Sequence, residues 1–545
     1  MFCSESAGAV RPWPYAVDRR FGPDPALGDA SVLALRGRVH HCARRNPIVT
    51  QFAAARTTAL VDRPPDSDAA FVLYWMIAQR RVTWNFALER AAGWARELGK
   101  PLLVFEPLRA GYSWASDRLH RFVIDGMADN AARLAARGIA YFPYVEASAG
   151  AGRGLLAALA GRAAVVVTDN YPAFMLPRMV AAAAPQVPVR FEQVDGNGLL
   201  PIHLAKQTFT SAYAFRRFLQ RTLAAHIGDQ PSVDPLLNLP AVKAPVVPAD
   251  VLLRWPAADP GALAGTPGLA SLPIDHTVAP TALRVGATAA DAALAQFLSS
   301  GLPFYADDRN DLERDVTSRL SPYLHFGHLS PHAVVQTVLQ REGWLGEVSR
   351  RTSGAREGWW GVGPGAEAFL DQIITWRELG FNMCATRPLD YDQYGSLPAW
   401  ARTTLALHGD DEREHVYTLE EFEAGRTHDL LWNAAQRQLV WEGRIHNYLR
   451  MLWGKKILEW TASPEEALAV MIELNNKYAL DGRDPNSYSG IFWTLGRYDR
   501  PWFERPVFGT VRYMSSTNTA RKLRVKSYLA RYAPVAADAG QPSLW

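Results

Sequence analysis

Cysteine is scarce in this chain, which has three among 545 residues. Cys3, Cys42 and Cys384 lie too far apart for a disulfide framework or for a metal site with close ligand spacing, so a reducing compartment is expected. Long apolar runs that could span a bilayer are also missing, and early arginines interrupt any signal-peptide core. We therefore expect a cytoplasmic protein without a membrane segment.

Net charge and the common cofactor motifs are likewise in short supply. The net charge is +4 with a pI near 8.8, which says little about partners. No GxGxxG or Walker pattern predicts a standard dinucleotide site, and neither a catalytic triad nor a metal cluster is expected. Tryptophan is abundant instead: 18 are present, most of them after residue 340, and each taken singly is best explained as a core residue.

The length predicts two domains, because 545 residues exceed the usual size of one. Residues 1–65, rich in Arg, Ala and Pro, form an N-terminal extension. Residues 66–205 alternate short apolar runs with amphipathic stretches, which is typical of an α/β domain with a doubly wound, five-stranded parallel sheet. The predicted strands are Phe71–Trp75, Leu102–Phe105, Ala140–Tyr144, Val165–Val167 and Val189–Phe191.

The rest of the chain divides into a connector, a helical domain and a tail. Residues 206–290, rich in Pro and Gly, predict a connector with a few short helices. Residues 291–533 predict an all-α domain, and residues 534–545 a C-terminal tail. Ser463 before Pro464 and two glutamates indicates a helix start. Helical periodicity covers Ala289–Leu298, Pro331–Gln340, Ala366–Asn382, Asp429–Trp460 and Pro464–Leu474, whereas Asp481–Asn486 predicts a loop.

Two segments of the helical domain combine polar groups in patterns that suit a cofactor. Hydroxyl side chains and backbone N–H groups cluster near Arg319, within Thr317–Gly327, and could bind a diphosphate, although a Ser/Thr-rich helix cap is an equal alternative. Gln372 and Trp376 are four residues apart and share a helix face. An amide beside an indole suits a flat heterocycle, and the alternative is a half-buried interface helix.

Two further segments are rich in tryptophan and charged residues. Trp453 and Trp460 are seven residues apart, so they share a helix face about 10 Å apart along its axis. A packed core pair is the alternative for them. The other segment runs from Leu474 through the Asp481–Asn486 loop to Trp493, and a last signature follows at Asp499–Met514.

In this order, the segments resemble class II cyclobutane pyrimidine dimer photolyases of the photolyase/cryptochrome superfamily over about residues 66–533. The strings that carry the resemblance are DNYPAFMLPRM, VDGNGLLP, LSPYLHFGH, HDLLWNAAQ, YLRMLWGKKILEW, LDGRDPN and ERPVFGTVRYM. The resemblance implies a U-shaped FAD in the helical domain and light-driven electron transfer from reduced FAD to a pyrimidine dimer flipped out of UV-damaged DNA. It also implies a possible antenna chromophore, a deazaflavin or a folate, in the α/β domain, and we expect a monomer.

The resemblance assigns roles residue by residue. The residues implied for FAD binding are Tyr305, Arg309, Thr317, Ser318, Arg319, Leu320, Ser321, Arg450, Asn475, Asp481 and Asp484. Among them, Asn475 matches the residue that faces flavin N5. The implied tryptophan relay, which carries electrons from the surface to the flavin, comprises Trp432, Trp453 and Trp460. The residues implied for the dimer are Gln372, Trp376, Met451 and Trp493.

The chain departs from the class II pattern on the substrate side. Asp371 and Gln372 stand where that class usually has two glutamates. The second glutamate resembles the acid that stabilises the dimer radical anion, and Gln372 has no carboxylic acid group for this role. Weaker repair or a changed substrate is therefore expected, with a non-repairing photoreceptor or repair of another photoproduct such as (6-4) as alternatives. The last signature has Tyr498, Thr510 and Ser515 where His, Lys and Asn are usual. A basic terminal helix offers candidates for contacts with the DNA backbone, and the alternative is that its charges only form a solvated face. The candidates are Arg521, Lys522, Arg524, Lys526 and Arg531.

Overall fold

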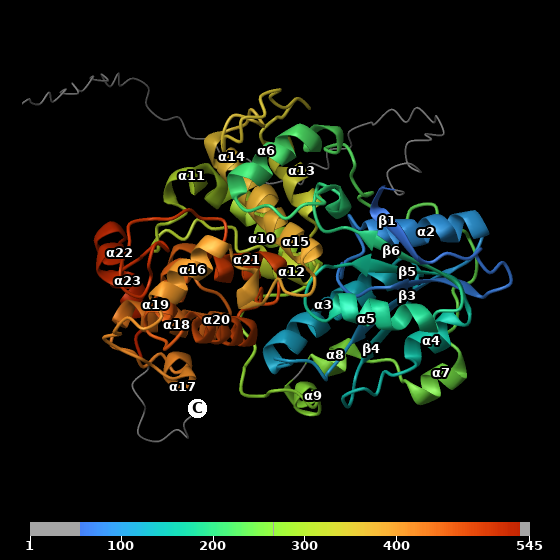
Figure 1. The fold of residues 1–545 in the computed structure, drawn as a ribbon. Helices are drawn as coiled ribbons and strands as arrows, with labels where there is room; N and C mark the ends of the chain where they lie inside the picture. The colour runs from blue at the N-terminus through green and yellow to red at the C-terminus, as the bar shows by residue number, and fades with distance from the viewer. Residues whose placement is uncertain (1–54, 265, 535–545) are drawn as a thin grey trace, which may run out of the picture. The chain divides into compact units, whose positions relative to one another are not determined.

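The computed structural model describes residues 55–264 and 266–534 (Figure 1). Most of the predicted extension, nearly all of the predicted tail, and Cys3 and Cys42 lie outside the described residues. Cys384 is buried and carries a free thiol. No described helix is long and apolar enough to cross a membrane.

The N-terminal part is an α/β domain built on a six-stranded sheet in the order β1-β6-β5-β2-β3-β4. The five predicted strands are all present and pair in parallel, as expected for strands that are joined by crossover helices. The sixth, β1, lies in a segment assigned to the extension and pairs antiparallel with β6 at the sheet edge. The strands are β1 (Thr57–Val61), β2 (Phe71–Trp75), β3 (Leu102–Leu108), β4 (Ala140–Val145), β5 (Ala163–Asn170) and β6 (Arg190–Asp195).

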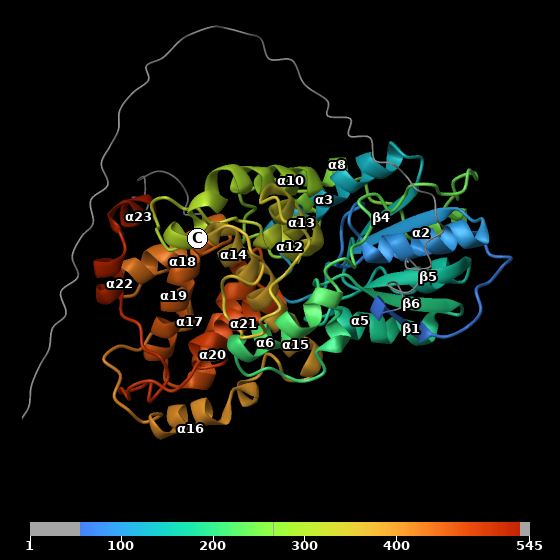
Figure 2. The ribbon, with the colours of Figure 1, turned by 90° about the horizontal axis from the view of Figure 1, so that it is seen from above.

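Helices cover both faces of the sheet, so the doubly wound prediction is confirmed (Figure 2). Alternate residues of β2 point to opposite faces: Val72 and Tyr74 pack with helix α2, whereas Leu73 and Trp75 pack with α4 and α5. The helices of this domain are α2 (Phe86–Leu98), α3 (Asp117–Ala135), α4 (Leu155–Ala160) and α5 (Leu176–Ala183).

The connector contains short helices, as its proline content predicts. The longest, α6, begins after Ser211, whose hydroxyl accepts a hydrogen bond from the N–H of Ala214. The helices are α6 (Ala212–Thr222), α7 (Ala249–Arg254), α8 (Pro260–Leu263) and α9 (Thr266–Ala270). Single 3₁₀ turns occur at Ala184–Gln186, Ile202–Leu204, Leu223–Ala225, Leu302–Phe304 and Tyr394–Ser396.

The C-terminal part is helical, as predicted. Its first helices are α10 (Ala287–Gln296), α11 (Tyr305–Asp308), α12 (Ser321–His325), α13 (Pro331–Arg341), α14 (Pro364–Leu370), α15 (Arg377–Thr386), α16 (Ala399–Leu407) and α17 (Leu419–Glu423). The remainder are α18 (Leu430–Glu442), α19 (Asn447–Glu459), α20 (Pro464–Tyr478), α21 (Pro485–Thr494), α22 (Ser516–Lys522) and α23 (Lys526–Arg531). Two π-helical turns, η4 (Phe297–Gly301) and η6 (Asp371–Trp376), interrupt this series.

Two helix predictions need correction. The range Asp429–Trp460 is two helices, because Gly443 adopts a left-handed conformation (φ 68°) that ends α18. The range Ala366–Asn382 contains the π-helical turn η6 between α14 and α15. The predicted helix start at Ser463 is confirmed, since its hydroxyl accepts from the N–H of Glu466.

A glycine of the LSPYLHFGH string allows the helical domain to pack closely against the α/β domain. Gly327 has a φ of 76°, and a Cβ built there would lie 1.9 Å from the carbonyl oxygen of Ala78, which follows β2. The carbonyl of Gly327 accepts a hydrogen bond of 2.9 Å from the buried guanidinium of Arg81. Any side chain at this position would push the two domains apart.

The VDGNGLLP string forms a second close contact between the two domains. The buried carboxylate of Glu378, on α15, accepts a hydrogen bond of 2.7 Å from the N–H of Leu199. Arg377, next to it, donates to the carbonyl of Asn197 at 2.5 Å. A Cβ at Gly198 would lie 2.6 Å from the carboxyl carbon of Glu378, so only glycine allows this approach.

This buried carboxylate predicts a pH-dependent stability. Burial raises the pKa of Glu378 from 4.5 to about 7, although the Leu199 N–H and Arg377 oppose the rise. The folded protein binds this proton more tightly than the unfolded chain, so the stability contribution is present below the unfolded pKa and is lost as the pH rises through 7. Relative to Glu378→Gln, the wild-type free energy of unfolding should fall by on the order of 2–3 kcal/mol between about pH 5 and pH 8.

Urea unfolding of both proteins across this pH range measures the difference. The exposed Glu357, changed to Gln in the same way, serves as the control and should show no comparable trend. A constant difference between wild type and Glu378→Gln would contradict a raised pKa at this position.

Candidate active site

The Asp481 carboxylate joins predicted site residues from three elements. It accepts a hydrogen bond of 2.9 Å from the guanidinium of Arg450 on α19, and another from the hydroxyl of Ser321 on α12. Burial alone would raise the pKa of Asp481, but Arg450 and Ser321 outweigh it and hold that pKa below its usual value. The LDGRDPN loop therefore carries an ionised carboxylate that positions an arginine beside it.

Asn475 lies under the same loop, in the last turn of α20. Its side-chain NH₂ donates to the carbonyl of Gly482 at 3.0 Å and to the hydroxyl of Ser487 at 2.9 Å. Among the described residues, nothing donates to its side-chain oxygen. The amide orientation is therefore fixed by its donors, and its acceptor is left for another group.

Asp315 organises the segment predicted to bind a diphosphate. It accepts from Thr317 at 2.6 Å, from Arg319, and from Arg444 at 2.9 Å. Burial alone would raise the pKa of Asp315, but Arg444 and Thr317 lower it well below its usual range. Arg319 adopts a positive φ of 53°, so the chain turns sharply between α11 and α12.

The remaining predicted cofactor residues border this segment. Tyr305 is buried on α11, and the guanidinium carbon of Arg309 lies 5.9 Å from its ring centroid. Leu320 is buried, whereas the Ser318 hydroxyl accepts weakly from the Leu320 N–H at 3.5 Å. Asp484 caps α21 through the N–H of Asn486 rather than pairing with Arg450.

FAD fits the polar groups that these residues present. The Nε of Arg450 is buried and has no hydrogen-bond partner among the described residues, and the Asn475 side-chain oxygen has no donor there. A flavin ring offers both acceptors and an N–H for such groups. Thr317, Ser318 and Arg319 add hydroxyls and a cation of the kind that binds phosphate.

The predicted relay tryptophans form one array, with Trp432 in the middle. Its ring is parallel to that of Trp453 (centroids 6.5 Å apart, 4° between planes) and lies 6.0 Å from that of Trp460. The Trp432 indole N–H donates to the carbonyl of Trp453, and the Trp453 N–H donates to the side-chain oxygen of Gln436. All three rings are buried.

The two ends of the array differ. Trp453 follows Arg450 by three residues on α19, so it lies one turn from the arginine of the predicted flavin site. Trp460 ends that helix and contacts the rings of Tyr417 at 5.8 Å and His428 at 4.9 Å, which are less buried. The array thus runs from the predicted cofactor site towards the surface.

Four half-buried side chains make up the predicted substrate site. Gln372 and Trp376 are the two residues of η6 that are not buried, so this π-helical turn presents both on one side. Met451 lies on α19 and Trp493 on α21, and α21 packs against both α15 and α19. Among the described residues, Trp376 and Trp493 make no ring contact with each other. Asp371, beside Gln372, points away and forms a buried pair with Arg216 at 2.7 Å.

Two cations beside Trp493 were not predicted as site residues. The ammonium of Lys455 lies 5.1 Å from its ring centroid, and the guanidinium carbon of Arg512 lies 5.5 Å away. Both lie in strings that carry the resemblance, so a signal was present in the sequence. Their approach to one ring depends on tertiary packing and could not be derived from spacing.

A bridge from the α/β domain to the LDGRDPN loop was also missed. The hydroxyl of Tyr171 donates to Asp484 at 3.0 Å, and His325 lies 3.4 Å from the same carboxylate. Burial lowers the pKa of His325, although Asp484 opposes this. The signal was the position of Tyr171 and His325 in DNYPAFMLPRM and LSPYLHFGH.

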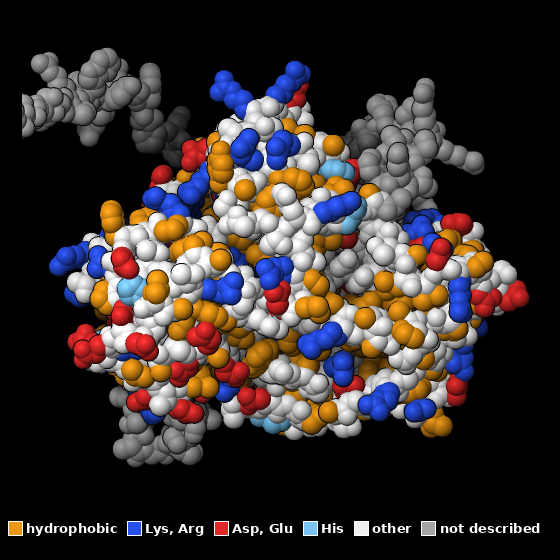
Figure 3. Space-filling model, viewed as in Figure 1, with side chains coloured by type: hydrophobic (Ala, Val, Ile, Leu, Met, Phe, Trp, Pro, Cys, Tyr) orange, Lys and Arg blue, Asp and Glu red, His pale blue; other side chains and the backbone are white. Residues whose placement is uncertain are grey.

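Four of the predicted basic residues near the C-terminus lie on two short helices, α22 and α23, and Arg524 lies in the segment between them. Arg524 pairs with Asp311 at 3.3 Å, and Arg531 pairs with Glu442 at 2.9 Å, so two of the five cations are already engaged. On the face shown in Figure 3, Lys and Arg side chains gather over α6, α14 and the loop above them, whereas Asp and Glu gather around α17.

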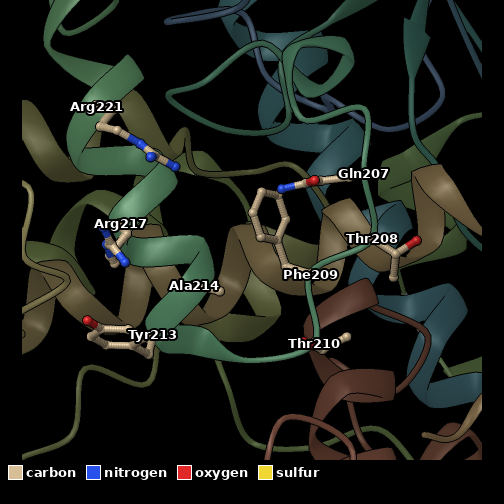
Figure 4. A pocket seen from close by; sticks show the side chains of 8 residues that line it. All are labelled: Gln207, Thr208, Phe209, Thr210, Tyr213, Ala214, Arg217 and Arg221. Atoms are coloured by element: carbon tan, nitrogen blue, oxygen red, sulfur yellow. The ribbon is translucent and has the colours of Figure 1, made fainter.

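A surface pocket of about 340 Å³ lies beside α6 (Figure 4). Tyr213, Arg217 and Arg221 line it from successive turns of the helix, and the preceding loop adds Gln207 and Thr208. None of the predicted site residues lines this pocket, so it is separate from the predicted flavin site.

Known proteins similar to this chain carry one recurrent name. Residues 72–240 match the family model described as DNA photolyase. A deoxyribodipyrimidine photo-lyase from Methanothermobacter thermautotrophicus is 34% identical over 88% of this chain and 98% of its own length. Relatives of the same name from Oryza sativa (35% identical; 84% of this chain and 87% of the relative) and Potorous tridactylus (33%; 86% and 82%) align similarly.

A solved structure has the same fold. The crystal structure of a bacterial class III photolyase from Agrobacterium tumefaciens has a TM-score of 0.61 at 17% sequence identity. The match covers 85% of this chain and 86% of that one. At this identity the likeness concerns the fold: an α/β domain followed by a helical domain.

Proposed function

Because the chain belongs to the DNA photolyase family, we propose that it repairs cyclobutane pyrimidine dimers in UV-damaged DNA by light-driven electron transfer from reduced FAD. Photolyase-type DNA repair is the activity that its named relatives share. The class II type is part of the proposal and rests on the strings of the sequence. The observation that carries it is the buried array of three tryptophans that begins one turn from Arg450.

The residues that would hold FAD come from the segment 305–321, from α19, from the end of α20 and from the LDGRDPN loop. Thr317, Ser318 and Arg319 would bind the diphosphate, and Tyr305 with Arg309 would border it. Arg450 would direct its free Nε, and Asn475 its free oxygen, towards the flavin ring. Reduced FAD, when bound, supplies a light-excited electron donor.

The chain itself performs two tasks in this mechanism. Trp376 and Trp493 would flank the flipped dimer, because a base removed from the stack needs apolar walls. Trp460, Trp432 and Trp453, in that order, would pass electrons inward to restore the reduced cofactor. The indole N–H groups of Trp432 and Trp453 are both hydrogen-bonded, which fixes the spacing of their rings.

The central position of Trp432 makes it the sharpest test of the relay. Trp432→Phe should lose most of the photoreduction of the flavin, because it breaks the array between Trp453 and Trp460. Repair should be spared once the flavin has been reduced chemically. Absorption at the flavin bands under blue light with a reductant measures the first, and dimer splitting measures the second.

Trp441→Phe on the same helix is a matched control, because Trp441 packs on Tyr532 outside the array. Trp453→Phe should slow photoreduction as Trp432→Phe does. Unchanged photoreduction in both relay variants would remove the relay from the proposal.

Restoring a glutamate at position 372 should increase the dimer-splitting activity. Gln372 has no titratable proton, so Gln372→Glu should raise the dimer-splitting yield roughly two- to tenfold by adding one stronger hydrogen bond to the dimer radical anion. The yield per absorbed photon on a dimer-containing oligonucleotide measures this. The exposed Gln340→Glu is the control. A flat or lower yield would mean that position 372 does not face the dimer.

The decisive test of the function is repair under light. UV-damaged plasmid incubated with the protein should regain transforming activity only when illuminated. Substrates with cyclobutane dimers alone and with (6-4) products alone separate the proposed function from the alternative photoproduct. A photoreceptor would bleach and recover its flavin but repair neither substrate. The absorption spectrum of the purified protein also decides whether a deazaflavin or folate antenna is bound.

A further inference from the structure

We propose that Lys455 is a positioning residue of the dimer site: with Arg512, it fixes Trp493 and supplies positive charge beside the flipped dimer. The inference rests on the proposed function and deepens it, because it concerns the substrate side of the same site. In this proposal, Lys455 stabilises the dimer radical anion, which an acid at position 372 would otherwise do.

The geometry converges on one ring. Trp493 lies in the last turn of α21 and is half-buried. The ammonium of Lys455 approaches it to 5.1 Å from α19, and the guanidinium of Arg512 to 5.5 Å from the segment after α21. Both distances are within the range in which a cation is attracted to an indole ring, so the two cations restrict its orientation.

Lys455 is an unusual group to bury. Its side chain is 0% exposed, and its one hydrogen bond, of 2.6 Å, goes to the carbonyl of Thr494. No carboxylate of the described residues lies within ion-pair distance of it. Thr494 is the last residue of α21, so the ammonium also meets the negative end of that helix. A capping role alone does not account for an unpaired buried charge, since burying one is costly.

Arg512 differs, because its charge is balanced. It forms two hydrogen bonds with Asp499, of 2.7 and 3.0 Å, and its guanidinium carbon lies 4.0 Å from the ring centroid of Trp502. This bidentate pair fixes the arginine rigidly. The cluster of Lys455, Arg512 and Asp499 therefore has a net charge of one when Lys455 is protonated and none when it is neutral.

That remaining charge lies where the chemistry needs it. A dimer stacked on Trp493 becomes an anion when it gains an electron from the reduced flavin, and a nearby cation in a site of low polarity stabilises it. Both cyclobutane C–C bonds would break and the extra electron would then return to its donor, so no further reductant or proton would be required. Gln372 contributes no acid, which leaves Lys455 as the group whose charge state matters.

The same burial gives the site a pH signature. Burial lowers the pKa of Lys455 from 10.5 to about 7; Asp499 opposes this and Arg512 reinforces it. These two, both from the segment after α21, are the charged groups that act on Lys455. Burial alone would raise the pKa of Asp499, but Arg512 holds it below its usual value.

The experiment compares Lys455→Met with the adjacent Lys456→Met. Methionine keeps most of the side-chain length and removes the charge, and Lys456 faces Trp460 and Tyr513 instead of Trp493. Each holoenzyme is reduced chemically, so the relay is not used, and saturated with an oligonucleotide containing one cyclobutane dimer. The splitting yield per absorbed photon is then measured between about pH 6 and pH 9.

Wild type should lose yield as the pH rises through the titration of Lys455. Lys455→Met should be roughly three- to tenfold below wild type at low pH and independent of pH. Lys456→Met should follow the wild-type profile. Full yield and an unchanged profile in Lys455→Met would overturn the inference while leaving the proposed function intact. A wild type that splits no dimer would instead overturn the proposed function, and the inference with it.

Asp499→Asn keeps the inference testable if Lys455→Met does not fold. Removing the facing carboxylate should move the midpoint of the yield profile to lower pH, because Asp499 raises the pKa of Lys455. An unmoved midpoint in a folded Asp499→Asn protein would assign the titration to another group and overturn the inference.

Discussion

One short loop, Asp481 to Asp484, constrains most of the functional region. Asp481 orients Arg450, the carbonyl of Gly482 orients Asn475, and Asp484 starts α21 while it accepts the hydroxyl of Tyr171 from the α/β domain. A Cβ at Gly482 would lie 2.5 Å from the carbonyl oxygen of Asn475, so the loop can fold this closely only with glycine. The proposed cofactor site, the helix proposed to contact the substrate and the domain interface thus share one set of hydrogen bonds.

Much of this arrangement could be predicted from local sequence. Apolar runs separated by amphipathic stretches are enough to predict parallel strands with helices on both faces, because burial on two sides leaves no polar position in a strand such as Phe71–Trp75. The helix start at Ser463 follows from capping chemistry alone. The candidate site depended on long strings, because Arg450 and Asp481 are 31 residues apart and no spacing rule joins them.

What could not be predicted depends on contacts distant in sequence. The helical periodicity predicted for Asp429–Trp460 spans Gly443, where the left-handed conformation ends α18 and the N–H of Leu480 donates to the Gly443 carbonyl at 2.9 Å. Edge strand β1 takes its direction from its partner β6 and not from its own residues. Lys455 lies in a helical pattern that does not distinguish it from its neighbours. Its approach to Trp493 becomes visible only when the later segment that carries Arg512 packs against the same ring.

The π-helical turn η6 sets the rotation of everything that follows it. It accommodates one residue more than an α-helical turn would, so deleting a residue there would leave a continuous helix but rotate α15 by about 100°. Glu378 and Arg377 would then face away from the VDGNGLLP loop that they bind. The number of residues in this segment, independent of which residues they are, therefore fixes how α15 is rotated towards the α/β domain. Chimaeras that exchange the segment must keep its length before they keep its sequence.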